Sequence, residues 1–155
     1  MTEIADGPRP ATTQQDGPDA EHSRPAGLDD ATVAALGKLS EAFEVIEQAR
    51  GSLYAFHRLT GRADLALGDA VTLFQDAGHA ELAAALEQQL LGRNVLHGRW
   101  TFQIVEEYDD GYYALFRSLE ERARDELAGG RRHLYEAEMK EARRTHGAPG
   151  HEALP

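Results

Sequence analysis

Four residues between positions 47 and 57 carry side chains that could bind a ligand or transfer a proton. Glu47, Arg50, Tyr54 and His57 are three, four and three residues apart, so a helix would place them on one strip of its surface. Such polar residues beside an apolar stripe indicate either a site or a polar network between two helices. In the second case we expect Glu47 and Arg50 to form an ion pair.

Three more residues complete the candidate ligand-binding set, and we expect them to face this strip from other helices. They are Tyr108, Tyr112 and His133. A di-iron bundle needs Glu-x-x-His pairs, which this chain lacks. The chain also has no His-Glu-x-x-His motif, which a zinc protease would use, and no cysteine to bind a metal. We therefore predict no metal site and no cofactor.

The familiar catalytic signatures are also absent from the sequence. It contains no P-loop, no Gly-x-Gly-x-x-Gly and no Gly-x-Ser-x-Gly, and its serines do not follow an elbow pattern. Enzymatic activity stays open, but the sequence favours a non-enzymatic function.

The stretch from residue 100 to residue 116 holds six of the eleven aromatic residues and a run of acids. Four carboxylates in five consecutive positions cannot share one helix face, so most must be solvated. The alternatives are a solvated face with core aromatics or an interface that binds a partner, because Tyr and Trp are favoured at interfaces. The candidate interface residues are Trp100, Glu106, Glu107, Asp109, Asp110 and Tyr113.

A basic segment follows the acidic one. Arg131 and Arg132 would stand at the N-terminus of a last helix, where backbone N–H groups favour an anion. The alternative is charge pairing with residues 100–128, which hold eight acidic and three basic side chains. Nucleic-acid binding through the basic residues Lys140, Arg143 and Arg144 is disfavoured, since Glu136, Glu138 and Glu141 lie among them.

Helices must position all of these residues. Apolar periodicity and glycine breaks predict helices over about 30–60, 64–77, 79–91, 102–128 and 131–145, with Gly61 ending the first and Asp64 capping the second. Alternation at 100–104 and the turn dipeptide Asp110-Gly111 would suit a β-hairpin, but nine apolar positions at helical spacing outweigh it. The sequence predicts an all-α bundle of four or five helices.

Composition sets the frame for this fold. The chain has 155 residues and a net charge of −11, with room for one domain over 28–145. Residues 1–27 are rich in Pro, Gly and polar residues and are predicted to be disordered, and residues 146–155 to form a flexible tail. No apolar run reaches the roughly 20 residues that span a bilayer, and no secretory signal opens the chain, so we expect a cytoplasmic protein.

Through two segments, 92–113 and 131–147, roughly residues 28–155 resemble a group of small uncharacterised proteins from actinobacteria. The first reads GRNVLHGRWTFQIVEEYDDGYY and the second RRHLYEAEMKEARRTHG. That resemblance implies no activity. From the residues alone, the hypothesis is a non-enzymatic helical interaction or oligomeric module that uses its acidic aromatic surface. The alternative is a small-molecule or metal-binding bundle with a polar site between the first and fourth predicted helices. As partner we expect a second copy or another protein, and neither nucleic acid nor a membrane.

Overall fold

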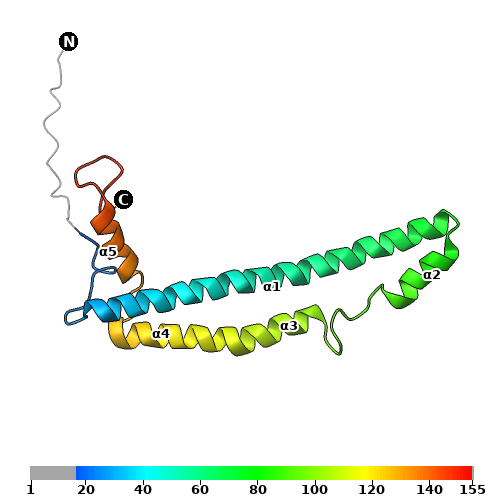
Figure 1. The fold of residues 1–155 in the computed structure, drawn as a ribbon, viewed down its shortest axis with the longest axis horizontal. Helices are drawn as coiled ribbons and strands as arrows, with labels where there is room; N and C mark the ends of the chain where they lie inside the picture. The colour runs from blue at the N-terminus through cyan, green and yellow to red at the C-terminus, as the bar shows by residue number, and fades with distance from the viewer. Residues whose placement is uncertain (1–16, 155) are drawn as a thin grey trace, which may run out of the picture. The chain divides into compact units, whose positions relative to one another are not determined.

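The computed structural model describes residues 17–154, and its described part is all-α (Figure 1). Its elements are α1 (Asp30–Asp76), α2 (Ala80–Gln89), α3 (Thr101–Tyr108), the π-helical turn η1 (Asp109–Tyr113), α4 (Ala114–Ala128) and α5 (Leu134–Arg143). Residues 17–154 contain no β-strand, and the predicted all-α bundle is confirmed. Of the disorder predicted for residues 1–27, the part over 1–16 lies outside the described residues, whereas residues 17–27 are described and belong to no helix.

The helix α1 corrects the prediction of two separate helices. It runs through Gly61 and Asp64 for 47 residues. A glycine inside a helix costs only about 1 kcal/mol, which packing along the helix can offset. Asp64 does not cap a helix, because it lies inside α1, and its carboxylate accepts a hydrogen bond from the backbone N–H of Gly92 at 2.8 Å. Gly78, with φ of 85°, follows the helix as predicted.

The stretch from Thr101 to Ala128 is helical throughout, so the β-hairpin alternative is wrong. Its apolar stripe at helical spacing outweighs the short alternation at its start. The turn dipeptide Asp110-Gly111 lies inside η1, where the helix widens locally into a π-helical turn. Such turns are often found at functional sites, which directs attention to Asp109 and Tyr113 at its two ends.

The described chain divides into two compact units. We call residues 17–37 with 123–154 the terminal unit, and residues 38–122 the central unit. In the terminal unit, Val33, Ala128 and Leu134 form a small core, with Leu28 and Leu36 packed against it. The helix α5 begins at Leu134, three residues later than predicted, because Gly129, Gly130 and His133 all have positive φ.

In the central unit, α1 lies antiparallel to the α3–η1–α4 segment. The order of partners shows this, since Ser40 bonds Glu120, Arg50 bonds Asp109 and His57 contacts Thr101. Phe43 stacks on Tyr113 and Phe116, with ring centroids 5.8 Å apart in each pair. The buried apolar side chains here are Val71, Ala83 and Val105. No helix in the described chain has both the length and the apolar character needed to cross a membrane.

Candidate functional site

The central unit brings five polar and aromatic side chains together, and we call them the Asp109 cluster: Glu47, Arg50, Tyr54, Asp109 and Tyr113. Arg50 donates two hydrogen bonds to the Asp109 carboxylate, Nε to Oδ1 at 2.8 Å and Nη2 to Oδ2 at 3.0 Å. The Tyr54 hydroxyl donates a third, to Oδ2, at 2.6 Å. Tyr113 donates from its hydroxyl to Glu47 Oε1 at 2.6 Å. The helix α1 and the turn η1 are thus joined by charge-assisted bonds.

The electrostatics of the cluster follow from these bonds. The Arg50 guanidinium, helped by the Tyr54 hydroxyl, lowers the pKa of Asp109. The hydrogen bond to Asp109 raises the pKa of Tyr54, and that to Glu47 raises the pKa of Tyr113. The guanidinium also lies over both phenol rings, 4.5 Å from the Tyr113 centroid and 5.0 Å from that of Tyr54.

These shifts bear on what chemistry the cluster could do. A general acid or base works best when its pKa lies near the operating pH. Both phenols are shifted further from neutrality, and the carboxylate is shifted further below it. The donors and acceptors of the cluster satisfy one another. This arrangement suits a structural clamp between two helices better than a proton-transfer site.

The predicted ion pair between Glu47 and Arg50 is wrong. Both residues lie on α1, and in the described chain they do not pair. Arg50 pairs with Asp109, 59 positions away, and Glu47 accepts from Tyr113. Spacing on one helix identified the polar strip but not its partners, which come from η1.

The other members of the predicted ligand-binding set lie elsewhere. His57 Nδ1 is 2.8 Å from the Thr101 hydroxyl. The rings of Tyr108 and Tyr112 contact each other at 6.0 Å between centroids. His133 belongs to the terminal unit, where it precedes α5 with φ of 58°. The structure therefore gathers Glu47, Arg50 and Tyr54 and adds two residues that had been assigned to an interface.

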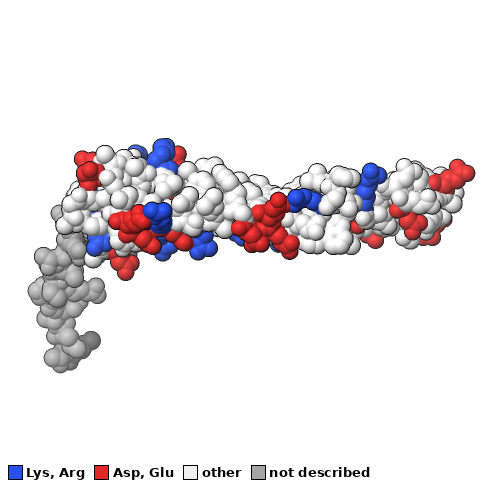
Figure 2. Space-filling view, turned by 90° about the horizontal axis from the view of Figure 1, so that it is seen from below, with Lys and Arg blue, Asp and Glu red and all other residues white. Residues whose placement is uncertain are grey.

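The predicted interface divides into two groups. Asp109 and Tyr113 contact α1, as described above. The rest are exposed: Trp100, Glu106, Glu107 and Asp110, with Tyr112 beside them. Trp100 is 56% exposed and packs against Phe102, and Glu107 pairs with Arg99. On the face that Figure 2 draws, acidic side chains stand in separate groups, with basic and uncharged ones between them.

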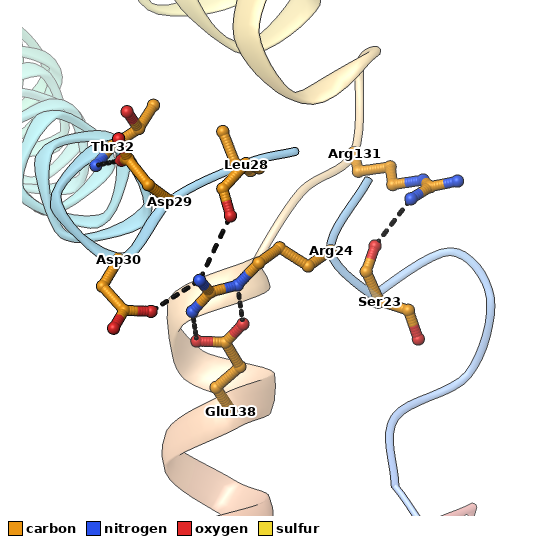
Figure 3. A network of polar contacts seen from close by, with 8 residues as sticks. All are labelled: Ser23, Arg24, Leu28, Asp29, Asp30, Thr32, Arg131 and Glu138. Atoms are coloured by element: carbon orange, nitrogen blue, oxygen red, sulfur yellow. Dashed lines mark hydrogen bonds and ion pairs between the residues drawn. The ribbon is translucent and has the colours of Figure 1, made fainter. Parts of the chain in front are cut away.

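In the terminal unit, the candidate anion site begins before the helix, not within it. Because α5 starts at Leu134, Arg131 and Arg132 precede its first turn. Arg131 donates to the Ser23 carbonyl at 2.8 Å (Figure 3). Arg132 is exposed, and both arginines line an open pocket of about 430 Å³ that Glu21 also lines. The Glu21 carboxylate opposes binding of an anion there.

In the same unit, hydrogen bonds and ion pairs hold the segment 17–29, which forms no helix, against the helices. Arg24 donates to both carboxylate oxygens of Glu138, at 2.6 and 2.7 Å, and to Asp30 at 2.6 Å (Figure 3). Arg144, which directly follows α5, has an almost fully buried side chain that is bonded to Glu141. Arg144 is therefore not exposed for binding nucleic acid, which reduces the basic surface that the sequence predicted around Lys140 and Arg143.

A pocket beside Trp100 was not predicted from the sequence. Its volume is about 610 Å³, and it lies between α1 and the connection from α2 to α3. Thr60, Gly61, Asp64 and Leu67 line it from α1, and Arg93, Val95 and Trp100 from the connection. The only signal in the sequence was the Gly92–Arg99 connection itself, which reads as a loop.

Comparison with known proteins adds no relative. No protein-family model matches the chain, and neither do any curated protein sequences or solved structures. This agrees with a resemblance that carries no activity, and the functional argument rests on the geometry described above.

Proposed function

We propose that this protein is a non-enzymatic helical module that associates with a protein partner through exposed apolar and aromatic side chains. The observation that carries the proposal is the balance of burial in the central unit. Large apolar residues such as Phe56, Leu59, Trp100 and Leu115 are 41–59% exposed, while three apolar side chains are buried. Large exposed apolar side chains that lie together in a patch mark an interaction site.

The Asp109 cluster supports the same proposal, because its polar groups are used within the chain. Its charged groups bond one another, so the polar strip that could have formed a ligand site holds two helices together instead. The side chains of Trp100, Tyr112, Glu106 and Asp110 stay exposed, as does Glu107 with its partner Arg99. That composition suits a partner that offers an apolar patch with basic residues at its rim.

The test is association of the full chain in solution. Light scattering after size exclusion, over a wide concentration range, should give a mass above one chain, or affinity capture should recover a defined partner. Trp100 is the single tryptophan, so its emission and its quenching by acrylamide report whether its surface becomes covered. A monomer at every concentration that captures no partner, with unchanged quenching of Trp100, contradicts the proposal.

A second candidate function is binding of a small molecule in the pocket beside Trp100. Its volume suits a drug-sized ligand, and Asp64, Arg93 and Asn94 supply polar groups beside apolar side chains such as Leu67 and Trp100. A metabolite panel screened by thermal shift and by Trp100 fluorescence tests it. A ligand of this pocket should change both signals, and no hit across the panel would count against this function.

A further inference from the structure

The helix α1 carries a second stripe, apart from the strip that holds the Asp109 cluster. It follows steps of three and four residues, none of its members is charged, and every member is exposed. We call it the α1 seam, and its residues are Ala42, Val45, Ala49, Ser52, Phe56, Leu59 and Ala63. Val45 is 56% exposed, Phe56 41% and Leu59 59%. The seam was not predicted from the sequence, because other apolar residues of α1 also recur at helical spacing.

The spacing of the seam is that of a coiled coil. Alternating steps of three and four give the heptad period, in which such positions pack between the side chains of a facing helix. The one polar member is satisfied within its own helix, since the Ser52 hydroxyl donates to the Gln48 carbonyl at 3.1 Å. A helix that presents a heptad stripe to solvent leaves one packing face unfilled.

We infer that the seam binds a second copy of this chain, with the two α1 helices antiparallel. This inference rests on the proposed function, association with a protein partner. A twofold axis passing between Arg50 and Gly51 then sets Val45 opposite Phe56 of the second copy. It also sets Ala42 opposite Leu59 and Ala49 opposite Ser52. Each of the first two layers joins a larger side chain to a smaller one, and the central layer is small, so the helices can approach closely. The interface is isologous, as in most homodimers.

The residues that flank the seam decide the direction. One flank holds Glu41, Gln48, Ala55 and Arg62, and the other holds Ile46, Leu53 and Thr60. In a parallel pair each flank meets the opposite flank of its partner, which would set Glu41 and Arg62 against apolar side chains. In an antiparallel pair each flank meets the same flank of the second copy, because the twofold axis is perpendicular to the helices. The polar flank then faces the polar flank, and the more apolar flank faces its equivalent.

The antiparallel register then gives charge complementarity. Glu41 near one end of the seam meets Arg62 of the second copy, and the symmetry makes this contact twice. Glu41 already bonds Lys38 at 2.5 Å, but a carboxylate can accept several hydrogen bonds. Arg62 is exposed and has no ion-pair partner among residues 17–154 of its own chain. Charge pairs at these flanking positions are what set partner choice and orientation in coiled coils.

Cysteine crosslinking tests the geometry, because the chain has no cysteine of its own. The register predicts that V45C alone and F56C alone do not form disulfide-linked dimers on mild oxidation, whereas the V45C/F56C double variant does. Within one chain these positions are about 16 Å apart along α1, too far for an internal bond. If the single variants crosslink as well as the double variant, the helices are parallel or in another register, and the inference is overturned.

A matched pair of substitutions tests the surface. Leu59 on the seam and Leu65 off it are both exposed leucines of α1, 59% and 74%. Leu59→Asp should raise the dissociation constant about a hundredfold, because each dimer buries that side chain twice. Leu65→Asp should leave it unchanged. Circular dichroism checks that both variants stay helical, and equal effects of the two would overturn the inference.

A charge exchange tests the register independently of folding. Glu41→Arg and Arg62→Glu should each weaken the dimer about fivefold, and the double exchange should restore it. Failure to restore contradicts the register. The outcomes also separate the two claims. An oligomer that survives Leu59→Asp keeps the proposed function and rejects the seam. A wild-type chain that is monomeric but captures another protein rejects the homodimer alone. A monomer that binds nothing rejects both.

Discussion

Replacing Asp109 with Asn distinguishes a structural clamp from a ligand site. The wild-type carboxylate accepts two bonds from Arg50 and one from Tyr54, and its side chain is 20% exposed. An Asn keeps the shape but turns an NH₂ group toward one of these donors. Charged hydrogen bonds contribute about 1.5–3 kcal/mol when buried, and exposed ion pairs less than about 1 kcal/mol. For this partly exposed group we expect a loss of about 1.5 kcal/mol in the free energy of unfolding.

The control is Asp110→Asn at the neighbouring position, which is exposed and outside the cluster. Thermal melts followed by circular dichroism should show Asp109→Asn melting about 5 °C lower than wild type, and Asp110→Asn unchanged. Because the folded state lowers the pKa of Asp109, its contribution is present above the ordinary carboxyl pKa of 3.8 and is lost as the pH falls below it. The gap between Asp109→Asn and wild type should therefore close in acid. Equal losses for both variants, or a gap that persists at low pH, would refute the clamp.

Two further predictions follow from single contacts. An ideal Cβ at Gly37 would lie 2.9 Å from Cβ of Tyr135, while one at Gly51 meets nothing within 4 Å. Gly51→Ala should therefore raise the free energy of unfolding in urea by about 0.5–1 kcal/mol. Gly37→Ala should be less stable than Gly51→Ala by about 1–3 kcal/mol, because its Cβ meets the Tyr135 side chain. Equal effects of the two substitutions would show that Tyr135 moves aside at no cost. Hydrogen bonds raise the pKa of Tyr54 and Tyr113, so their bonds stabilise the fold below pH 10 and lose this effect as the phenols ionise above it. Ultraviolet titration should show late-ionising tyrosines, with one fewer in Tyr113→Phe, and a simple titration near pH 10 would contradict the two bonds.

Local signals in the sequence predicted the elements well where backbone chemistry is decided by near neighbours. The break predicted between residues 77 and 79 is an example, since Gly78 follows the end of α1 with positive φ. Helical periodicity over 102–128 prevailed over a short alternation, because a stripe over many turns is supported by more contacts than a few alternating positions.

Tertiary contacts decided what local signals left open. The continuity of α1 through Gly61 was one such point, since the propensity penalty of one glycine is small beside the packing of a long helix. The partner of Arg50 was another. On its own helix Glu47 is three positions away, but bonding Asp109 joins two helices and leaves Glu47 for Tyr113.

The sequence by itself determined the all-α class, the polar strip on α1 and the concentration of aromatic and acidic residues after residue 100. These depend on composition and on spacing within one helix, which the chain carries in its own order. Only the tertiary structure decided that Asp109 and Tyr113 face inward, that Trp100 and Tyr112 stay exposed, and that a second stripe of α1 is left uncovered. Which face of a helix is buried depends on the elements packed against it, and those come from distant parts of the chain.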